Sequence, residues 1–237
     1  MLDRPRDLGE LLRDAFALLA ARPLGFLAVG LIFAGPIELV VSGVGLEQLT
    51  SGYQAKIQLV ETGVGTLSSY VLTTPLITAA SALLVAGAVP HAGRAAIRTV
   101  ETSTPLILAA ILAAAGVALG LFFLIIPGLY LVVRWFLFPQ AVALEHHTGV
   151  APLRRSGELT EGRWFRAAGV ILLANLLALL PGGLITLPLA ALAESRDREW
   201  PVLVGEILGQ AVTTPIVAVI ATLLFFDLRA RRAKPFD

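Results

Sequence analysis

The stretch LIIPGLYLVVRWFLFPQ, from Leu124 to Gln140, decides the fold class of this chain. It lies within 40 residues, Pro105 to Leu144, in which Arg134 carries the only charge. As one helix this run would be about 60 Å long at 1.5 Å per residue, about twice the hydrocarbon core of a bilayer. The run must therefore fold back on itself. We expect the reversal at Pro127-Gly128, because proline removes a helix donor and glycine permits a tight turn.

Composition supports a membrane protein. The chain has 237 residues, is 57% hydrophobic and 15% charged, and has a mean hydropathy of +0.82, whereas soluble domains are about 25% charged. It contains no cysteine, which excludes disulfides, thiolate catalysis and thiolate metal sites. Its arginines are scattered between apolar runs and form no basic stripe, so we expect no nucleic-acid partner. The composition predicts an all-α integral membrane protein.

Apolar windows of about 20 residues predict six transmembrane helices in a single membrane domain, residues 1–237. Residues 1–22 form a predicted cytoplasmic amphipathic helix, in which Asp7 and Glu10 have the spacing of a capping box. Residues 227–237 form a predicted cytoplasmic tail. The six spans are expected near residues 24–46, 68–89, 105–126, 129–144, 167–193 and 202–226.

Basic residues predict the orientation. With the N-terminus inside, 14 of the 18 Lys and Arg residues fall in inner segments and 3 in outer ones, so the positive-inside rule puts both termini in the cytoplasm. The localisation predicted is the cell membrane, with several crossings. Tyr130 then falls at the outer interface and Trp164 at the inner one, where aromatic rings anchor helices.

An internal repeat is a second feature of the chain. The triplet Thr-Thr-Pro occurs at residues 73–75 and again at 213–215. Two short segments, His91 to Thr102 and Ala151 to Arg163, precede the third and fifth spans as the amphipathic helix precedes the first. The chain is thus readable as three repeats of an amphipathic helix plus a helical hairpin. The alternative is that these two segments are simply charged cytoplasmic loops.

Three charges fall inside the predicted spans: Glu38, Arg134 and Glu206. Counted along their helices, all three lie about 7 to 9 Å below the outer boundary. Because a charge in lipid costs several kcal/mol unless it is paired, we expect Arg134 to bridge Glu38, Glu206 or both. The alternative is that Arg134 extends to the outer headgroups beside Trp135.

A basic rim is expected at the inner headgroup level, where it would suit anionic lipid phosphates, although ordinary positive-inside anchoring explains it equally well. Asp227 is a hypothetical partner of Arg229, Arg154 or Arg155 there. His91 stands alone and His146-His147 diverge by about 100° on a helix, so we expect no metal, no other cofactor and no catalytic site. The rim consists of Arg154, Arg155, Arg163, Trp164 and Arg166.

Three ordered motifs resemble a known family. They are LIIPGLYLVVR (Leu124 to Arg134), PLRRSGELTEGRWFR (Pro152 to Arg166) and FFDLRARR (Phe225 to Arg232). Together they resemble a bacterial and archaeal family of six-span proteins related to the membrane domain of some glycerophosphoryl diester phosphodiesterases. In the fused relatives a separate soluble barrel carries the chemistry. This chain has no such barrel, so the resemblance implies a stand-alone, non-catalytic member.

These observations favour a non-catalytic membrane module that binds or organises lipids, anionic ones among them, or partner proteins. The alternative is a small transporter or channel for a lipid or small solute, because Glu38, Arg134 and Glu206 share one layer and prolines interrupt two spans. A protein partner or a homo-oligomer is left open by the sequence.

Overall fold

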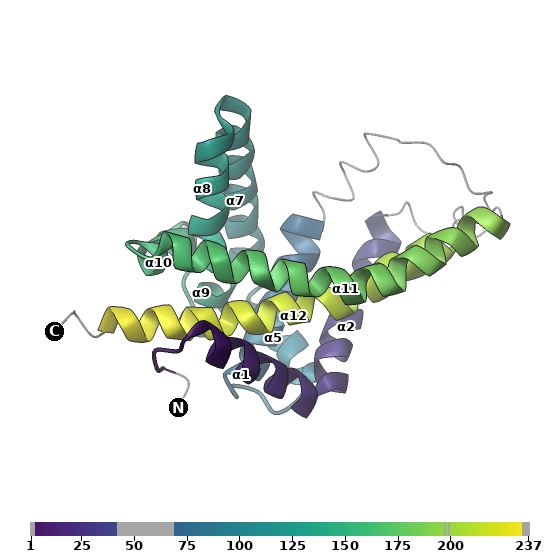
Figure 1. Cartoon of the computed structure of the whole chain (residues 1–237), viewed down its shortest axis with the longest axis horizontal. Helices are drawn as coiled ribbons and strands as arrows, with labels where there is room; N and C mark the ends of the chain where they lie inside the picture. Colours follow the sequence, from purple (N-terminus) through teal and green to yellow (C-terminus); the bar gives the residue numbers. More distant parts are fainter. Residues whose placement is uncertain (1–2, 42–68, 197, 199, 234–237) are drawn as a thin grey trace.

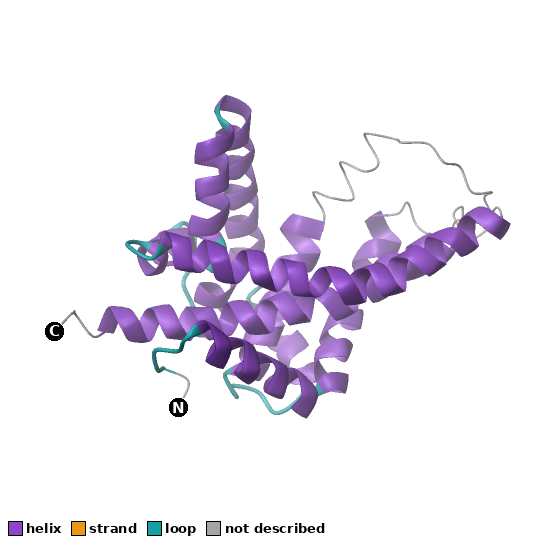
Figure 2. Ribbon diagram, in the orientation of Figure 1, coloured by secondary structure: helices purple, strands orange, loops and turns teal. Residues whose placement is uncertain are grey.

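The computed structural model describes residues 3–41, 69–196, 198 and 200–233, and every regular element within them is helical (Figure 2). The predicted all-α class is confirmed. In chain order the elements are α1 (Leu8–Ala21), α2 (Pro23–Val41), the π-helical turn η1 (Ser69–Thr73), α5 (Thr74–Val85), α6 (Ala92–Glu101), α7 (Ser103–Phe123), α8 (Ile125–Trp135), α9 (Phe138–Glu145), α10 (Ala151–Thr160), α11 (Trp164–Arg196) and α12 (Trp200–Ala233).

Five segments are long and apolar enough to cross a membrane: α2, α7, α8 together with α9, α11 and α12. They make the chain a multi-pass membrane protein by length and composition. The second predicted span, near residues 68–89, corresponds to η1 and α5, which are apolar but shorter, from Ser69 to Val85. Six full spans are therefore not present among the described residues. Residues 42–46 of the first predicted span lie outside them.

Short helices precede each pair of apolar helices. The capping box at α1 is confirmed, since the Asp7 carboxylate accepts from the backbone N–H of Glu10 at 2.6 Å and the Glu10 carboxylate accepts from that of Asp7. The segments expected near 91–102 and 151–163 fold as α6 and α10. The order of one short helix and two apolar segments thus occurs three times. The repeat relation itself stays a prediction.

The core is built around α12. Residues 218–228 of this helix are all buried, because α11, α2, α5 and α1 pack around it. A helix that is apolar on every side is surrounded either by protein or by lipid, and this stretch of α12 is surrounded by protein. Figure 1 shows α11 and α12 side by side, with α1 lying along the half of α12 that leads to the C-terminus.

The hairpin of α7 and α8 stands away from this core and runs across the direction of α11 and α12 (Figure 1). Its reversal is at Leu124, where the backbone is extended, and not at Pro127-Gly128 as predicted. Proline suits the first turn of a helix, so Pro127 marks the start of α8. Gly128 lies against α7, where a Cβ atom would be 2.5 Å from the side chain of Leu121. The glycine thus serves close packing within the hairpin, and not the turn.

The predicted span 129–144 is two helices. A break at Phe136 and Leu137 separates α8 from α9. Buried Ser156 of α10 stabilises the break, because its hydroxyl donates to the carbonyl oxygen of Arg134 at 2.8 Å and accepts from the N–H of Leu137 at 3.1 Å. The short helix α10 is thereby attached at the base of the hairpin.

Candidate functional site

Two of the three intramembrane charges come together. The side chain of Glu38 is 4% exposed. Its carboxylate accepts from Gln210 Nε2 at 2.5 Å and from Ser69 Oγ at 3.3 Å. The Glu206 carboxylate lies near enough for its charge to interact with that of Glu38. We name these two acids the acid pair: Glu38 is buried and is held by an amide and a hydroxyl, whereas the side chain of Glu206 is exposed.

Arg134 does not join the acid pair, so the predicted bridge is wrong. Its guanidinium donates to the hydroxyl of Tyr130 at 2.8 Å. It also lies on Gly157 of α10, where a Cβ atom would be 2.9 Å from Arg134 Nε. Within the described ranges, no carboxylate is within salt-bridge distance of Arg134. The guanidinium is therefore held by a neutral partner and a backbone surface.

The position of the hairpin turn explains this error. Because the reversal is at Leu124, Arg134 lies ten residues beyond it, about 15 Å down the helix. Tyr130, expected at the outer interface, stacks on Trp164, expected at the inner one, with ring centroids 6.1 Å apart. The indole N–H of Trp164 also donates to the carbonyl oxygen of Tyr130 at 3.3 Å. Arg134 thus lies with Arg154 and Glu158 of α10 at the base of the hairpin, and the alternative of outer headgroup contact stays a prediction.

A groove opens beside Arg134, between α7, α8 and α10. Its volume is about 500 Å³. Apolar side chains form most of its wall, and three charged side chains reach it: Arg134, Arg154 and Glu158. A second groove, of about 330 Å³, lies where the α1–α2 junction meets the junction of α5 and α6.

Members of the basic rim are largely used inside the protein. Arg155 pairs with Glu145 at 2.7 Å, and this hydrogen bond raises the pKa of the Arg155 guanidinium. Arg163 donates to the carbonyl oxygen of Arg231 at 3.2 Å. Arg154 pairs with Glu158 at 3.2 Å, yet its side chain remains 83% exposed. These arginines thus make contacts within the protein, and the contact of the rim with lipid stays a prediction.

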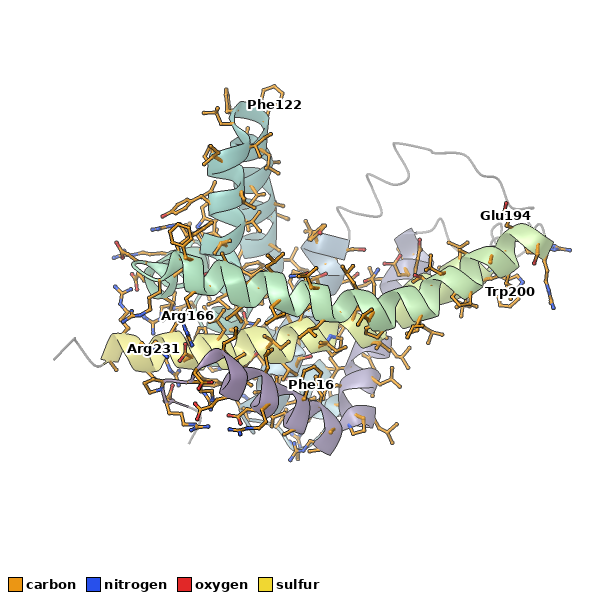
Figure 3. All side chains as sticks on the ribbon, viewed as in Figure 1. Phe16, Phe122, Arg166, Glu194, Trp200 and Arg231 are labelled. Atoms are coloured by element: carbon orange, nitrogen blue, oxygen red, sulfur yellow. The ribbon has the colours of Figure 1, made fainter. Side chains whose placement is uncertain are left out.

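The last arginine of the rim, Arg166, belongs to a cluster around Asp227. Asp227 is 0% exposed. It accepts from Arg166 Nε at 3.0 Å, from Arg231 Nε at 2.9 Å and from the backbone N–H of Arg6 at 2.7 Å. The partners hypothesised for it, Arg229, Arg154 and Arg155, are therefore the wrong ones. Figure 3 shows Arg166 and Arg231 close together, at the start of α11 and the end of α12.

The N-terminal segment is bound to this cluster by further contacts. The carbonyl oxygen of Arg6 accepts from both Arg166 and Arg231, at 2.5 and 2.7 Å. Burial opposes ionisation of Asp14, but hydrogen bonds and charge attraction from Arg6 and Arg4 outweigh it and lower the pKa of its carboxyl. These contacts hold both ends of the described chain on one side of the molecule.

The sequence analysis did not predict the roles of several of these residues. Gln210 follows Glu206 by four residues, so the two share a helix face, and this spacing could have pointed to a polar cluster in the spans. Tyr130 and Arg134 have the same spacing on α8. The contribution of Arg6 has no sequence signal, because it is made by backbone atoms.

Comparison of the chain with models of protein families gives no match, and comparisons with curated proteins and with solved structures give none either. The resemblance to the six-span family therefore stays a prediction. In the parts of the chain that the structure describes, no three His, Asp or Glu side chains come together as metal ligands.

Proposed function

We propose that this multi-pass membrane protein is a non-catalytic module that binds and organises lipids of the cytoplasmic membrane. One observation carries the proposal: two of its short helices, α1 and α6, bury one face on the bundle and expose apolar side chains beside arginines on the other. Such a surface suits the boundary between headgroups and acyl chains.

In α1, Leu11 and Ala15 are fully buried, while Phe16 is 49% exposed. Arg13 is exposed as well and precedes Phe16 by three residues, so the two are neighbours on the outer face. Arginine attracts anionic headgroups, and an aromatic ring anchors at their level.

In α6, the buried face consists of Ala95, Ala96 and Thr99. Its outer face exposes Ile97 by 59%, between the exposed side chains of Arg94 and Arg98. The second groove joins the end of α1 to the start of α6. The end of α1 and the start of α6 therefore line the same groove.

Lipid analysis of the purified protein tests this proposal. We expect anionic lipid to be enriched around the protein relative to the bulk membrane. Replacing Arg13, Arg94 and Arg98 by Gln lowers that enrichment, because each basic residue near a membrane surface contributes about 1 kcal/mol. The matched control is Arg196→Gln, which removes an exposed charge at the far end of α11. Equal enrichment in the triple variant and the control contradicts the proposal.

A second candidate function, transport of a proton or small cation, is favoured by the acid pair. A buried carboxylate such as Glu38, held by Gln210 and Ser69 among the spans, is a residue type found on ion pathways. Flux into proteoliposomes, measured with a pH-sensitive dye, tests it. Transport predicts a flux that Glu38→Gln abolishes, and an absence of flux in the wild type contradicts it.

A further inference from the structure

We propose that the groove between α7, α8 and α10 binds one molecule of anionic phospholipid, with the phosphate on Arg134 and Arg154 and an acyl chain along α7. This inference rests on the proposed lipid-binding function and names a discrete site for it. It concerns a different surface from the outer faces of α1 and α6.

The head of the site is the guanidinium of Arg134. Tyr130 hydroxyl at 2.8 Å and the backbone surface at Gly157 hold it in place, and neither neutralises its charge. A charge among apolar walls is costly unless an opposite charge lies beside it. A phosphate matches the planar fork of a guanidinium with two parallel hydrogen bonds. The fixed orientation of Arg134 prepares it for such a ligand.

Arg154 supplies a second positive charge at the mouth of the groove. Its side chain is 83% exposed, so it can turn toward a headgroup without losing packing. Its carboxylate partner Glu158 is shared with Arg155, which lies 3.6 Å from it. The charged side chains that line the groove are therefore two arginines and one acid, while Arg155 is engaged by Glu145 behind them. The net charge of the side chains at the mouth of the groove is therefore positive, which favours an anionic ligand.

The tail of the site is an apolar stripe on α7. Leu112 lines the groove, and Ala115, Leu119 and Phe122 follow it at intervals of three and four residues, which puts all four on one helix face. All are exposed, Phe122 by 83%. From Leu112 to Phe122 the stripe is about 15 Å long at 1.5 Å per residue, about half of a roughly 30 Å hydrocarbon core. That length matches the acyl region of one leaflet.

The arginines of the groove and the apolar stripe on α7 together indicate which kind of ligand fits the site. An acidic protein segment would match the arginines and leave the stripe on α7 uncovered. Figure 1 shows α10 at the base of the hairpin, from which α7 and α8 extend away from the bundle. A phospholipid has its charge at one end and its apolar chain at the other, in the same order as the groove and the stripe.

Native mass spectrometry of the full chain in a neutral detergent tests the site. We add phosphatidylglycerol or phosphatidylcholine and measure the affinity for the first lipid bound. The wild type should bind the first phosphatidylglycerol at least tenfold more tightly than phosphatidylcholine. Arg134→Gln should lower that affinity about tenfold or more, the scale of a charge-assisted hydrogen bond. Arg134→Lys should lower it less, because the charge remains and the planar fork is lost.

Controls separate the site from the general function. Arg196→Gln should bind phosphatidylglycerol as the wild type does. If Arg134→Gln fails to fold, Arg154→Gln tests the site instead, because the exposed side chain of Arg154 is not needed for packing. A several-fold loss of affinity for phosphatidylglycerol in this variant supports the site. An affinity equal to that of the wild type overturns it. Glycerol 3-phosphate, which lacks acyl chains, should not displace the lipid, and equal competition overturns the role of α7.

The outcomes for the two proposals are distinct. Undiminished binding by Arg134→Gln, with a wild type that still prefers phosphatidylglycerol, overturns the site and leaves the lipid-organising function standing. A wild type with equal affinity for the two lipids overturns both. Binding of an acidic peptide in place of lipid, lost in Arg134→Gln, overturns the lipid as occupant.

Discussion

Replacing Asp227 by Asn should destabilise the protein strongly. The Asp227 carboxylate accepts three hydrogen bonds from buried or half-buried donors: Oδ1 from the Arg6 N–H and from Arg231, and Oδ2 from Arg166. An amide has only one oxygen, so its NH₂ group must face at least one of these donors. Removing one partner of a buried ion pair costs about 3–5 kcal/mol. For a chain of this size, that corresponds to a fall in Tm of about 6 to 20 °C.

Thermal unfolding in detergent, followed by tryptophan fluorescence and circular dichroism, measures this effect. Asp3→Asn is the matched control, because the Asp3–Arg229 pair is exposed and such pairs contribute about 0.2–1 kcal/mol. Arg166→Gln should cost less in the Asp227→Asn background than alone, since the two side chains share one interaction. A Tm of Asp227→Asn equal to that of Asp3→Asn would refute the reasoning.

Two further predictions concern the N-terminal helix and the hairpin. Burial opposes ionisation of Asp14, but its ion pairs with Arg6 and Arg4 outweigh this effect and keep the pKa of its carboxyl in the folded state below the ordinary 3.8. The stability that Asp14 contributes is therefore complete above pH 3.8. It is lost as the pH falls through the pKa of the folded state. The Tm difference between wild type and Asp14→Asn, measured from pH 6 downward, should close in acid, and a constant difference would contradict this. Gly128→Ala should cost about 1–3 kcal/mol, since a Cβ atom there would lie 2.5 Å from a leucine of α7. Gly35→Ala is the control, because a Cβ atom at residue 35 would have no atom within 4 Å. In the same melting assay this variant should be neutral or stabilising by up to about 1 kcal/mol. An equal loss of stability in both variants would contradict the packing argument.

Local patterns in the sequence predicted local structure well. The Asp7 and Glu10 spacing predicted a capping box that the structure contains. Of the two alternatives for the segments before the third and fifth spans, short helices and charged loops, the structure has the helices α6 and α10. Long apolar windows predicted the membrane class. These features depend on neighbours within a few residues, so they need no knowledge of the tertiary arrangement.

Positions of charges in space were harder to predict. Depth counting for Arg134 assumed that the hairpin turns at Pro127-Gly128 and that one span continues to Leu144. The reversal lies at Leu124 and α8 ends at Trp135, so Arg134 is in the last turn of its helix. The acid pair depends on how α2 meets α12, and the partners of Asp227 depend on how the N-terminal segment meets α11 and α12. Such contacts join distant parts of the chain, and no spacing within one segment predicts them.

The bond from Arg6 to Asp227 joins residues 221 positions apart. Since synthesis proceeds from the N-terminus, the segment around Arg6 is made first, and the carboxylate that receives it is made near the end of α12. The cluster can therefore close only after all the preceding apolar helices have been synthesised. A chain interrupted before Asp227 would therefore lack the carboxylate that binds the N-terminal segment at Arg6, and the buried face of α1 alone would have to hold that segment to the bundle.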